Sequence, residues 1–318
     1  MKLVTYRPSP AGAERTGVRL DDGRVLDLAA ADSAFASRSM VDVLALDLVE
    51  RARAAASAAA TLPPSAFVRE EEAVLLAPLP RPVSVRDGYA FRKHVETARR
   101  NRGVPMIPEV DLFPVFYFTN HLAVTGPGQL RVGGGRLERL DFELECFCVI
   151  GKTVTNPTLA EADDAVAGYG VMNDWSARAL QMEEMKLNLG PAKGKDFATS
   201  IGPWLVTKDE LSARLTPSPK GNVLSARMTA HVNGVKVSEG DVSQMDWTFA
   251  QIVARAADGV TLHPGEVIGS GTVGTGCFLE LNGSKVTNDQ WLRPGDVVGL
   301  SIDGLGTLTH TIVEDPTK

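Results

Sequence analysis

From residue 140 onward, the sequence is a succession of short segments of β-type composition, separated by glycine-containing turns. These segments occupy residues 140–151, 226–240, 265–274, 277–283 and 296–313. Two expected helices interrupt them: residues 158–169, where Thr158 and Glu161 have the spacing of a capping box, and residues 176–186. The pattern predicts a strand-dominated domain with few, short helices.

The first 75 residues have a different texture. Residues 2–7 and 17–28 are typical of strands, with Asp22-Gly23 at a hairpin turn, and the alanine-rich residues 40–60 are typical of a helix. Two proline-rich segments follow, and the second ends near residue 82. We therefore expect an α+β, β-rich chain with a small α+β domain at residues 1–75 and a larger domain at residues 76–318.

Composition excludes several classes of protein. The 33 Lys and Arg residues against 39 Asp and Glu give a net charge of −6, which argues against a nucleic-acid binder. No run of about 18 apolar residues exists and the N-terminus has no apolar signal core, so we expect no membrane span and no signal peptide. The three cysteines form no C-x-x-C pair, which argues against a disulfide framework and against a thiolate zinc site. A reducing cytoplasm is the expected compartment.

Residues 141–151 are the most informative strand. Strand periodicity places Phe142 and Leu144 on an apolar face that continues to Ile150, while Asp141, Glu143 and Glu145 share the other face. One interpretation is a half-buried strand with a solvated acidic face. The other is an oxygen-ligand site for a hard divalent cation, because a cation makes buried, clustered carboxylates favourable.

Three further segments carry polar groups that could belong to such a site. Asp174 precedes Arg178 and Gln181 by four and seven residues, which would place all three on one side of a helix, although Asp174 could instead be its N-cap. Asp87 stands seven residues before His94, and Lys195 lies in the glycine-rich residues 190–204.

Gly269, Gly271 and Gly274 match the G-x-G-x-x-G pattern of dinucleotide-binding folds. That fingerprint requires a helix to open at the third glycine. Because residues 277–283 are predicted to form a strand and a turn, we interpret the glycines as a loop.

Together, the motifs of residues 80–312 resemble the fumarylacetoacetate hydrolase family. They are Asp87 with His94, A-V-T-G-P-G at 123–128, E-L-E at 143–145, M-N-D-W-S-A-R at 172–178, G-K-x-F at 194–197 and Gly271-Thr272. The resemblance implies a mixed β-roll catalytic domain, a homodimer, and a bound Mg²⁺, with Mn²⁺ or Ca²⁺ as alternatives.

The resemblance also implies roles for individual residues. The implied metal ligands are Asp87, Glu143, Glu145 and Asp174. His94 matches the base that activates water, and Lys195 and Gln181 match groups that hold the substrate and stabilise its negative charge. Arg178 would position the carboxylates or the substrate, with Tyr89 and Thr199 as further substrate contacts.

Two positions in the family carry a Glu that orients the histidine, and this sequence has no acid at either. One position aligns with residues 272–276, and the other is Thr97, next to Glu96. The orienting acid is therefore not identified from the sequence.

The expected activity is hydrolysis of a carbon–carbon bond in a small diketo acid of the fumarylacetoacetate or acylpyruvate type. Alternatives are a decarboxylase, isomerase or hydratase using the same enolate chemistry, and a non-catalytic, metal-dependent ligand-binding protein. The expected partner is a small anionic keto acid. The basic residues 92–102 are interpreted either as a solvated helix face or as a cationic lid that attracts a dianionic substrate.

Overall fold

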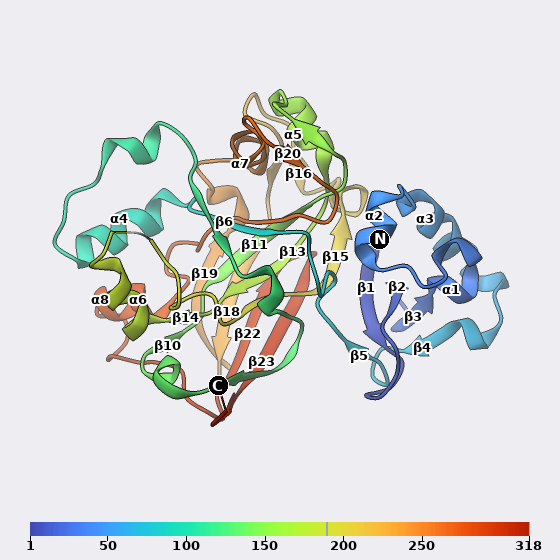
Figure 1. Cartoon of the computed structure of the whole chain (residues 1–318), viewed down its shortest axis with the longest axis horizontal. Helices are drawn as coiled ribbons and strands as arrows, with labels where there is room; N and C mark the ends of the chain where they lie inside the picture. The colour runs from blue at the N-terminus through green and yellow to red at the C-terminus, as the bar shows by residue number, and fades with distance from the viewer. Residues whose placement is uncertain (189, 318) are drawn as a thin grey trace.

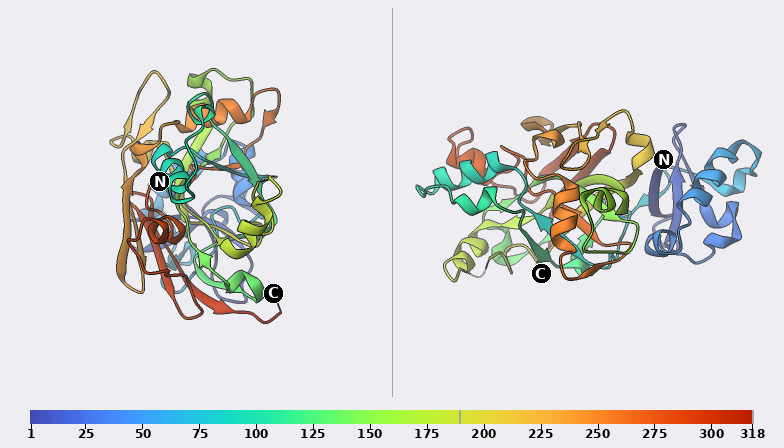
Figure 2. Two further views of the ribbon diagram at one scale, coloured as in Figure 1. Left: turned by 90° about the vertical axis from the view of Figure 1, so that its left-hand side faces the viewer. Right: turned by 90° about the horizontal axis from the view of Figure 1, so that it is seen from above.

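The computed structural model describes residues 1–188 and 190–317 and shows a strand-rich α+β protein. Its N-terminal elements lie at one end of the long axis (Figures 1 and 2). The largest sheet has the strand order β4-β3-β2-β1-β15-β13-β11-β21-β6-β7, with β5 paired to β1 and β8 paired to β15. Its strands are β1 (Lys2–Arg7), β2 (Arg15–Arg19), β3 (Arg24–Asp27), β4 (Phe67–Arg69), β5 (Val74–Leu75), β6 (Val85–Gly88), β7 (Phe116–Thr119), β8 (Val124–Thr125), β11 (Leu144–Ile150), β13 (Val166–Asp174), β15 (Thr199–Thr207) and β21 (Val267–Gly269).

A second sheet packs across the first, with the order β19-β18-β22-β23-β9. Its strands are β9 (Gly128–Val132), β18 (Arg227–Val232), β19 (Val235–Asp241), β22 (Val297–Ile302) and β23 (Gly306–Glu314). Three short pairs complete the strands: β10 (Leu140–Asp141) with β14 (Ser176–Ala177), β12 (Val154–Thr155) with β20 (Thr261–Leu262), and β16 (Leu215–Thr216) with β17 (Val223–Leu224).

The helices are short and lie around the sheets (Figure 1). They are α1 (Leu28–Ala31), α2 (Met40–Ala45), α3 (Val49–Ser57), α4 (Arg92–Asn101), α5 (Leu159–Ala165), α6 (Arg178–Met185), α7 (Phe249–Ala256) and α8 (Phe278–Gly283). The predicted capping box is confirmed, because Thr158 and Glu161 exchange side-chain-to-backbone hydrogen bonds at the start of α5. No helix within the described ranges has the length and apolar character needed to cross a bilayer.

Strand β11 is buried on both faces. Its side chains point alternately to the two faces, and each face packs into a different hydrophobic core. Cys146 and Cys148 belong to the core between the two large sheets, whereas Phe147 and Val149 belong to a second core with Leu3 of β1. The predicted apolar face is therefore confirmed. The opposite face is not solvated, since Glu143 and Glu145 are both buried.

The N-terminal strands extend the main sheet. Strand β1 pairs antiparallel with β15, with Lys2 opposite Val206 and Leu3 opposite Leu205. The second core also contains side chains from both regions, including Phe35 and Phe147. A domain boundary near residue 75 stays a prediction, but any such domains share one sheet and one core.

Three secondary-structure predictions are wrong. Residues 40–60 form two helices, because Asp47 between α2 and α3 adopts a positive φ of 53° that a continuous helix cannot contain. The expected helix at 158–169 ends at Ala165, and Val166 begins β13. Residues 277–283 are not a strand: helix α8 forms there, because the Asp141 carboxylate accepts the backbone N–H groups of Phe278 and Leu279 in its first turn.

Candidate active site

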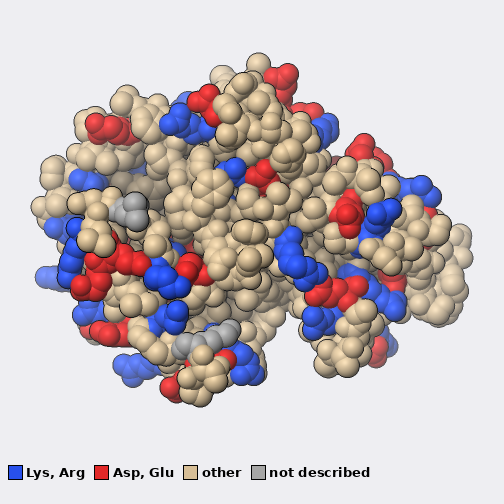
Figure 3. All heavy atoms as spheres, in the orientation of Figure 1, with Lys and Arg blue, Asp and Glu red and all other residues tan. Residues whose placement is uncertain are grey.

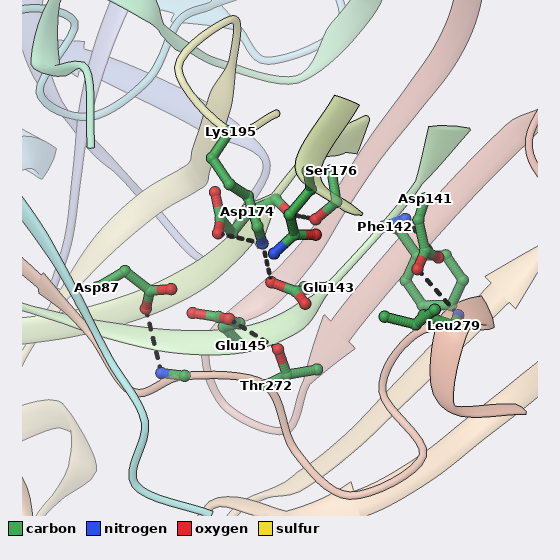
Figure 4. A network of polar contacts seen from close by, with 12 residues as sticks. Asp87, Asp141, Phe142, Glu143, Glu145, Asp174, Ser176, Lys195, Thr272 and Leu279 are labelled. Atoms are coloured by element: carbon green, nitrogen blue, oxygen red, sulfur yellow. Dashed lines mark hydrogen bonds and ion pairs between the residues drawn. The ribbon is translucent and has the colours of Figure 1, made fainter. Parts of the chain in front are cut away.

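The acidic side chains converge because their strands lie close together in the main sheet, in the order β13-β11-β21-β6. Asp87 lies on β6, Glu145 on β11 and Asp174 at the end of β13, while Glu143 directly precedes β11. Asp174 is therefore a strand residue and not part of helix α6, which corrects the prediction that it shares a helix face with Arg178 and Gln181. Figure 4 shows the carboxylates of Asp87, Glu143 and Glu145 turned toward a common space.

A glycine makes this convergence possible. Strand β21 separates β6 from β11, and its Gly269 is in register with Asp87. A Cβ atom at Gly269 would lie 2.4 Å from Oδ1 of Asp87, so any side chain there would displace the carboxylate. Two residues later, the N–H of Gly271 donates to the same Oδ1 atom at 3.2 Å. The glycine-rich loop therefore holds a carboxylate, not a phosphate.

Burial and mutual repulsion disfavour ionisation of this group of acids. The pKa of Asp87 is raised to about 8, first by burial and then by the charge of Asp174. The pKa of Glu145 is raised by burial and by Asp87, and that of Asp174 is raised by burial. Burial also opposes ionisation of Glu143, but Lys195 and Arg178 outweigh it and hold the pKa of Glu143 below its usual range.

The residues fit a hard divalent cation. One ligand oxygen from each of Asp87, Glu143 and Glu145 lies within 4.8 Å of the others. Two buried carboxylate oxygens, Oε2 of Glu145 and Oδ1 of Asp174, have no hydrogen-bond partner among the described residues. Buried, unsatisfied, all-oxygen donors are the ligand set that Mg²⁺, Mn²⁺ or Ca²⁺ prefers.

Two buried cations connect to the acids. Lys195 Nζ donates to Oδ2 of Asp174 at 2.6 Å and to Glu143, as Figure 4 shows. Arg178 donates to Oδ2 of Asp141 and to Oε1 of Glu143, both at 2.8 Å, and to Oε1 of Gln181 at 2.9 Å. Arg178 therefore orients carboxylates, and through Asp141 it is linked to the start of α8.

His94 has an acidic partner that the sequence did not reveal. Its Nδ1 atom lies 2.7 Å from Oε2 of Glu280, and both side chains are buried. When Glu280 is ionised, Nδ1–H donates to it, which leaves the Nε2 lone pair free to accept a proton. Asn101 of α4 donates to the backbone oxygen of Glu280 at 3.2 Å and so ties α4 to α8.

Glu280 was not predicted as the partner of His94, because its segment was expected to form a strand. Residues 277–283 alternate like a strand, whereas the structure forms a short helix capped by the distant Asp141. Thr97 is buried on α4, and Glu96 pairs with Arg92. Neither takes the role of orienting acid.

One cavity of about 580 Å³ joins these groups. It is lined by Asp87, Tyr89, His94, Glu143, Arg178, Gln181, Lys195 and Glu280, together with Arg99, Arg102, Val115, Phe116, Met182 and Met185. Thr199 does not line it: this residue is in register with Asp174 at the start of β15, and its hydroxyl contacts that of Thr119.

The basic segment divides into two groups of residues. Arg99 and Arg102 line the cavity, whereas Arg92 pairs with Asp111 and Arg100 donates to Thr97. On the face shown in Figure 3, basic and acidic side chains are interspersed and do not form a continuous basic stripe.

Comparison with known proteins identifies the class that this fold and site define. Residues 84–313 match the family model described as fumarylacetoacetate (FAA) hydrolase, C-terminal. A protein from Burkholderia ambifaria (strain MC40-6), provisionally named a hydrolase, is 33% identical over 309 residues, which covers 96% of each chain. The chain belongs to the fumarylacetoacetate hydrolase family, and its relatives support an enzyme.

Solved structures share the fold along almost the whole chain. Fumarylacetoacetate hydrolase from Exiguobacterium antarcticum matches with a TM-score of 0.73 at 24% identity, covering 99% of this chain and 100% of that one. Maleylpyruvate hydrolase from Sphingobium sp. SYK-6, solved with manganese(II) and pyruvate, gives 0.70 at 20% identity and 99% coverage of both. A 5-carboxymethyl-2-hydroxymuconate delta-isomerase from Mycobacterium smegmatis gives 0.67 at 22%, covering 99% of this chain and 100% of that one.

Proposed function

We propose that this protein is a divalent-cation-dependent hydrolase that cleaves a carbon–carbon bond in a small diketo acid of the fumarylacetoacetate or acylpyruvate type. The observation that carries the proposal is the His94–Glu280 pair, which lines the same cavity as Asp87 and Glu143. A histidine oriented by a buried carboxylate is the arrangement that activates a water molecule. Hydrolysis requires this step, whereas decarboxylation does not.

Asp87, Glu143 and Glu145 would hold the cation, with Asp174 completing the set. Mg²⁺ is the first candidate, and Mn²⁺ or Ca²⁺ would suit the same oxygen donors. When bound, such a cation supplies Lewis-acid polarisation to the oxygens of the substrate. Its charge would also offset the burial and the mutual repulsion that raise the pKa of Asp87 and Glu145.

His94 would act as general base. Nε2 takes a proton from water, and Glu280 stabilises the imidazolium that results. The hydroxide adds to the acyl carbonyl carbon, and the bond from that carbon to the neighbouring methylene breaks. The acyl carbon leaves as a carboxylic acid, and the electron pair stays on the methylene as an enolate, which takes up a proton to give the keto-acid product.

Lys195, Gln181 and Arg178 lie where they can hold the substrate. All three line the cavity, and Lys195 places its ammonium group next to Glu143 and Asp174. A buried positive charge there would stabilise the negative charge that develops on the enolate oxygen. Tyr89 lines the cavity beside His94, with the ring centroids 5.7 Å apart in an edge contact, and would limit the space for substrate.

Product analysis separates this reaction from its rivals. The Mg²⁺-loaded protein is incubated separately with an acylpyruvate, fumarylacetoacetate, oxaloacetate and a 2-hydroxydienoate, and the products are identified by chromatography. Cleavage of one of the first two into two acids supports hydrolysis. Release of CO₂ from oxaloacetate as the only reaction would replace the hydrolase proposal with a decarboxylase. Conversion of a 2-hydroxydienoate to an isomer of equal mass would replace it with an isomerase. No turnover of any of these compounds would favour a ligand-binding protein.

We further propose that the enzyme works as a homodimer in the cytoplasm. Support comes from the family resemblance for the dimer and from the three unpaired, buried cysteines for a reducing compartment. Light scattering at micromolar concentration should give twice the mass of the chain. A monomer mass would overturn the dimer.

A further inference from the structure

The thiol of Cys277 lies beside the His94–Glu280 pair. One ligand atom from each of His94, Cys277 and Glu280 lies within 4.8 Å of the other two. Cys277 is fully buried, and in the part of the chain that the structure describes, no residue forms a hydrogen bond with its Sγ atom. The reaction proposed above gives this thiol no task.

The spacing suits a small metal ion. Zinc binds sulfur at about 2.3 Å and nitrogen or oxygen at about 2.0–2.2 Å, so tetrahedral ligand atoms stand about 3.3–3.8 Å apart. The three ligand atoms lie within 4.8 Å of one another, so they reach that spacing when their separations change by at most about 1.5 Å. His94 and Glu280 face the cavity, so a fourth position would open toward it.

The two groups of ligands differ in chemistry. Asp87, Glu143 and Glu145 offer only oxygen, which suits hard cations, whereas the second group offers nitrogen, sulfur and oxygen. A thiolate and an imidazole select zinc and similar borderline or soft ions over Mg²⁺. Burial raises the pKa of the Cys277 thiol, and the negative charges of Asp141 and Glu143 raise it further, so a bound cation is what would hold the thiolate there.

We propose that His94, Cys277 and Glu280 form a second metal site, which takes a thiophilic divalent ion such as Zn²⁺ and blocks the enzyme when occupied. On binding, the thiol proton leaves to solvent, Sγ bonds to the ion, and an imidazole nitrogen and a Glu280 oxygen complete the protein ligands. The inhibitory part rests on the proposed function, because it assumes that His94 is the base. The binding part does not.

Binding is tested by spectroscopy, independently of activity. Cd²⁺ is titrated into the parent protein in the presence of saturating Mg²⁺, and the thiolate-to-cadmium charge-transfer band is followed in the ultraviolet. We expect one equivalent to give the band, and Cys277→Ala and Cys277→Ser to lose it. Loss of a direct ligand should weaken binding by more than roughly 100-fold, since loss of an outer-shell partner alone costs 10–100-fold.

Cys148→Ala is the matched control, because Cys148 is equally buried but lies in the core on β11. This variant should keep the band. Absence of the band in the parent protein would overturn the site even if the Cys277 variants fail to fold. Survival of the band in folded Cys277→Ala would overturn it as well.

Inhibition is tested by turnover. With saturating Mg²⁺, Zn²⁺ should inhibit the parent, while Cys277→Ala should keep the parental rate without Zn²⁺ and resist inhibition. Equal inhibition of both would place the effect at the carboxylate group and overturn the inhibitory role. If no diketo acid is turned over at all, the proposed function fails, and the cadmium band still decides whether the metal site exists.

Discussion

The imidazole of His94 and the carboxylate of Glu280 are hydrogen-bonded at 2.7 Å, although 186 residues separate them in the sequence. Helices α4 and α8 bring them together, and the Asp141 carboxylate fixes the start of α8. Asp141 also accepts from Arg178, which orients Glu143. Residues 141–145 therefore contain both the carboxylate that positions α8 and two of the acids, Glu143 and Glu145.

His94→Ala should lower kcat by about 10²–10⁴, the usual contribution of a positioned general base. Mg²⁺ affinity, measured by calorimetry, should hardly change, because His94 is not one of the proposed Mg²⁺ ligands. Glu280→Gln should also lower kcat, and the double variant should be no worse than His94→Ala, since the two residues act as one unit. Glu96→Gln, on the outer side of the same helix, is the control. Parental turnover in His94→Ala would contradict the assignment.

Removal of the metal should abolish turnover. EDTA should stop the reaction and Mg²⁺ or Mn²⁺ should restore it, because the enolate oxygen and the acids need a compensating charge. Glu145→Gln should weaken Mg²⁺ binding and leave the metal-free protein at least as stable in urea as the parent, because it removes a source of repulsion from buried acids. Full activity after exhaustive chelation would exclude the metal requirement.

The arginines that line the cavity should act on substrate capture. Changing Arg99 and Arg102 together to Gln should raise KM for a dianionic substrate roughly 10-fold or more and flatten the salt dependence of kcat/KM. The matched control is Arg92→Gln with Arg100→Gln, because these side chains contact Asp111 and Thr97 instead. If both pairs behave alike, the cavity-lining arginines are ordinary surface residues.

A buried histidine outside the cavity, His310, should make the free energy of unfolding depend on pH. Burial lowers the pKa of His310 to about 4, and its Nε2 atom lies 2.9 Å from the carbonyl oxygen of Gly126. The unfolded chain, with an ordinary histidine pKa near 6.5, binds this proton first as pH falls. The contribution of His310 to the free energy of unfolding is therefore complete above about pH 6.5. It decreases toward pH 4, by roughly 2–3 kcal/mol.

Urea unfolding at pH 7.5 and pH 4.5 measures this difference. His310→Gln should be less stable than the parent at pH 7.5, because the contact with Gly126 is altered, but should lose less stability on acidification. Equal pH dependence in both proteins would show that the pKa of His310 is the same in the folded and the unfolded state, and would contradict the prediction.

The sequence was sufficient to predict the acidic residues of the site but not the His94–Glu280 pair. Period-two alternation separates the faces of β11, and Glu143 and Glu145 lie on the same side as predicted. Their burial could not be predicted from alternation alone, because the side chains that cover them, such as Arg178, Lys195 and Thr272, come from distant parts of the chain. Glu280 was missed because α8 has only six residues, and its start depends on a capping carboxylate 137 residues away from Phe278.

Incorporation of ¹⁸O tests the central claim most directly. The Mg²⁺-loaded protein is given an acylpyruvate in H₂¹⁸O, and the carboxylic acid released from the acyl group is analysed by mass spectrometry. The account predicts one ¹⁸O atom in that acid from the first turnover, with the rate falling about 10²–10⁴-fold in His94→Ala. Turnover without ¹⁸O in an acid product would show that no water attacks the carbonyl, and would contradict the hydrolase assignment.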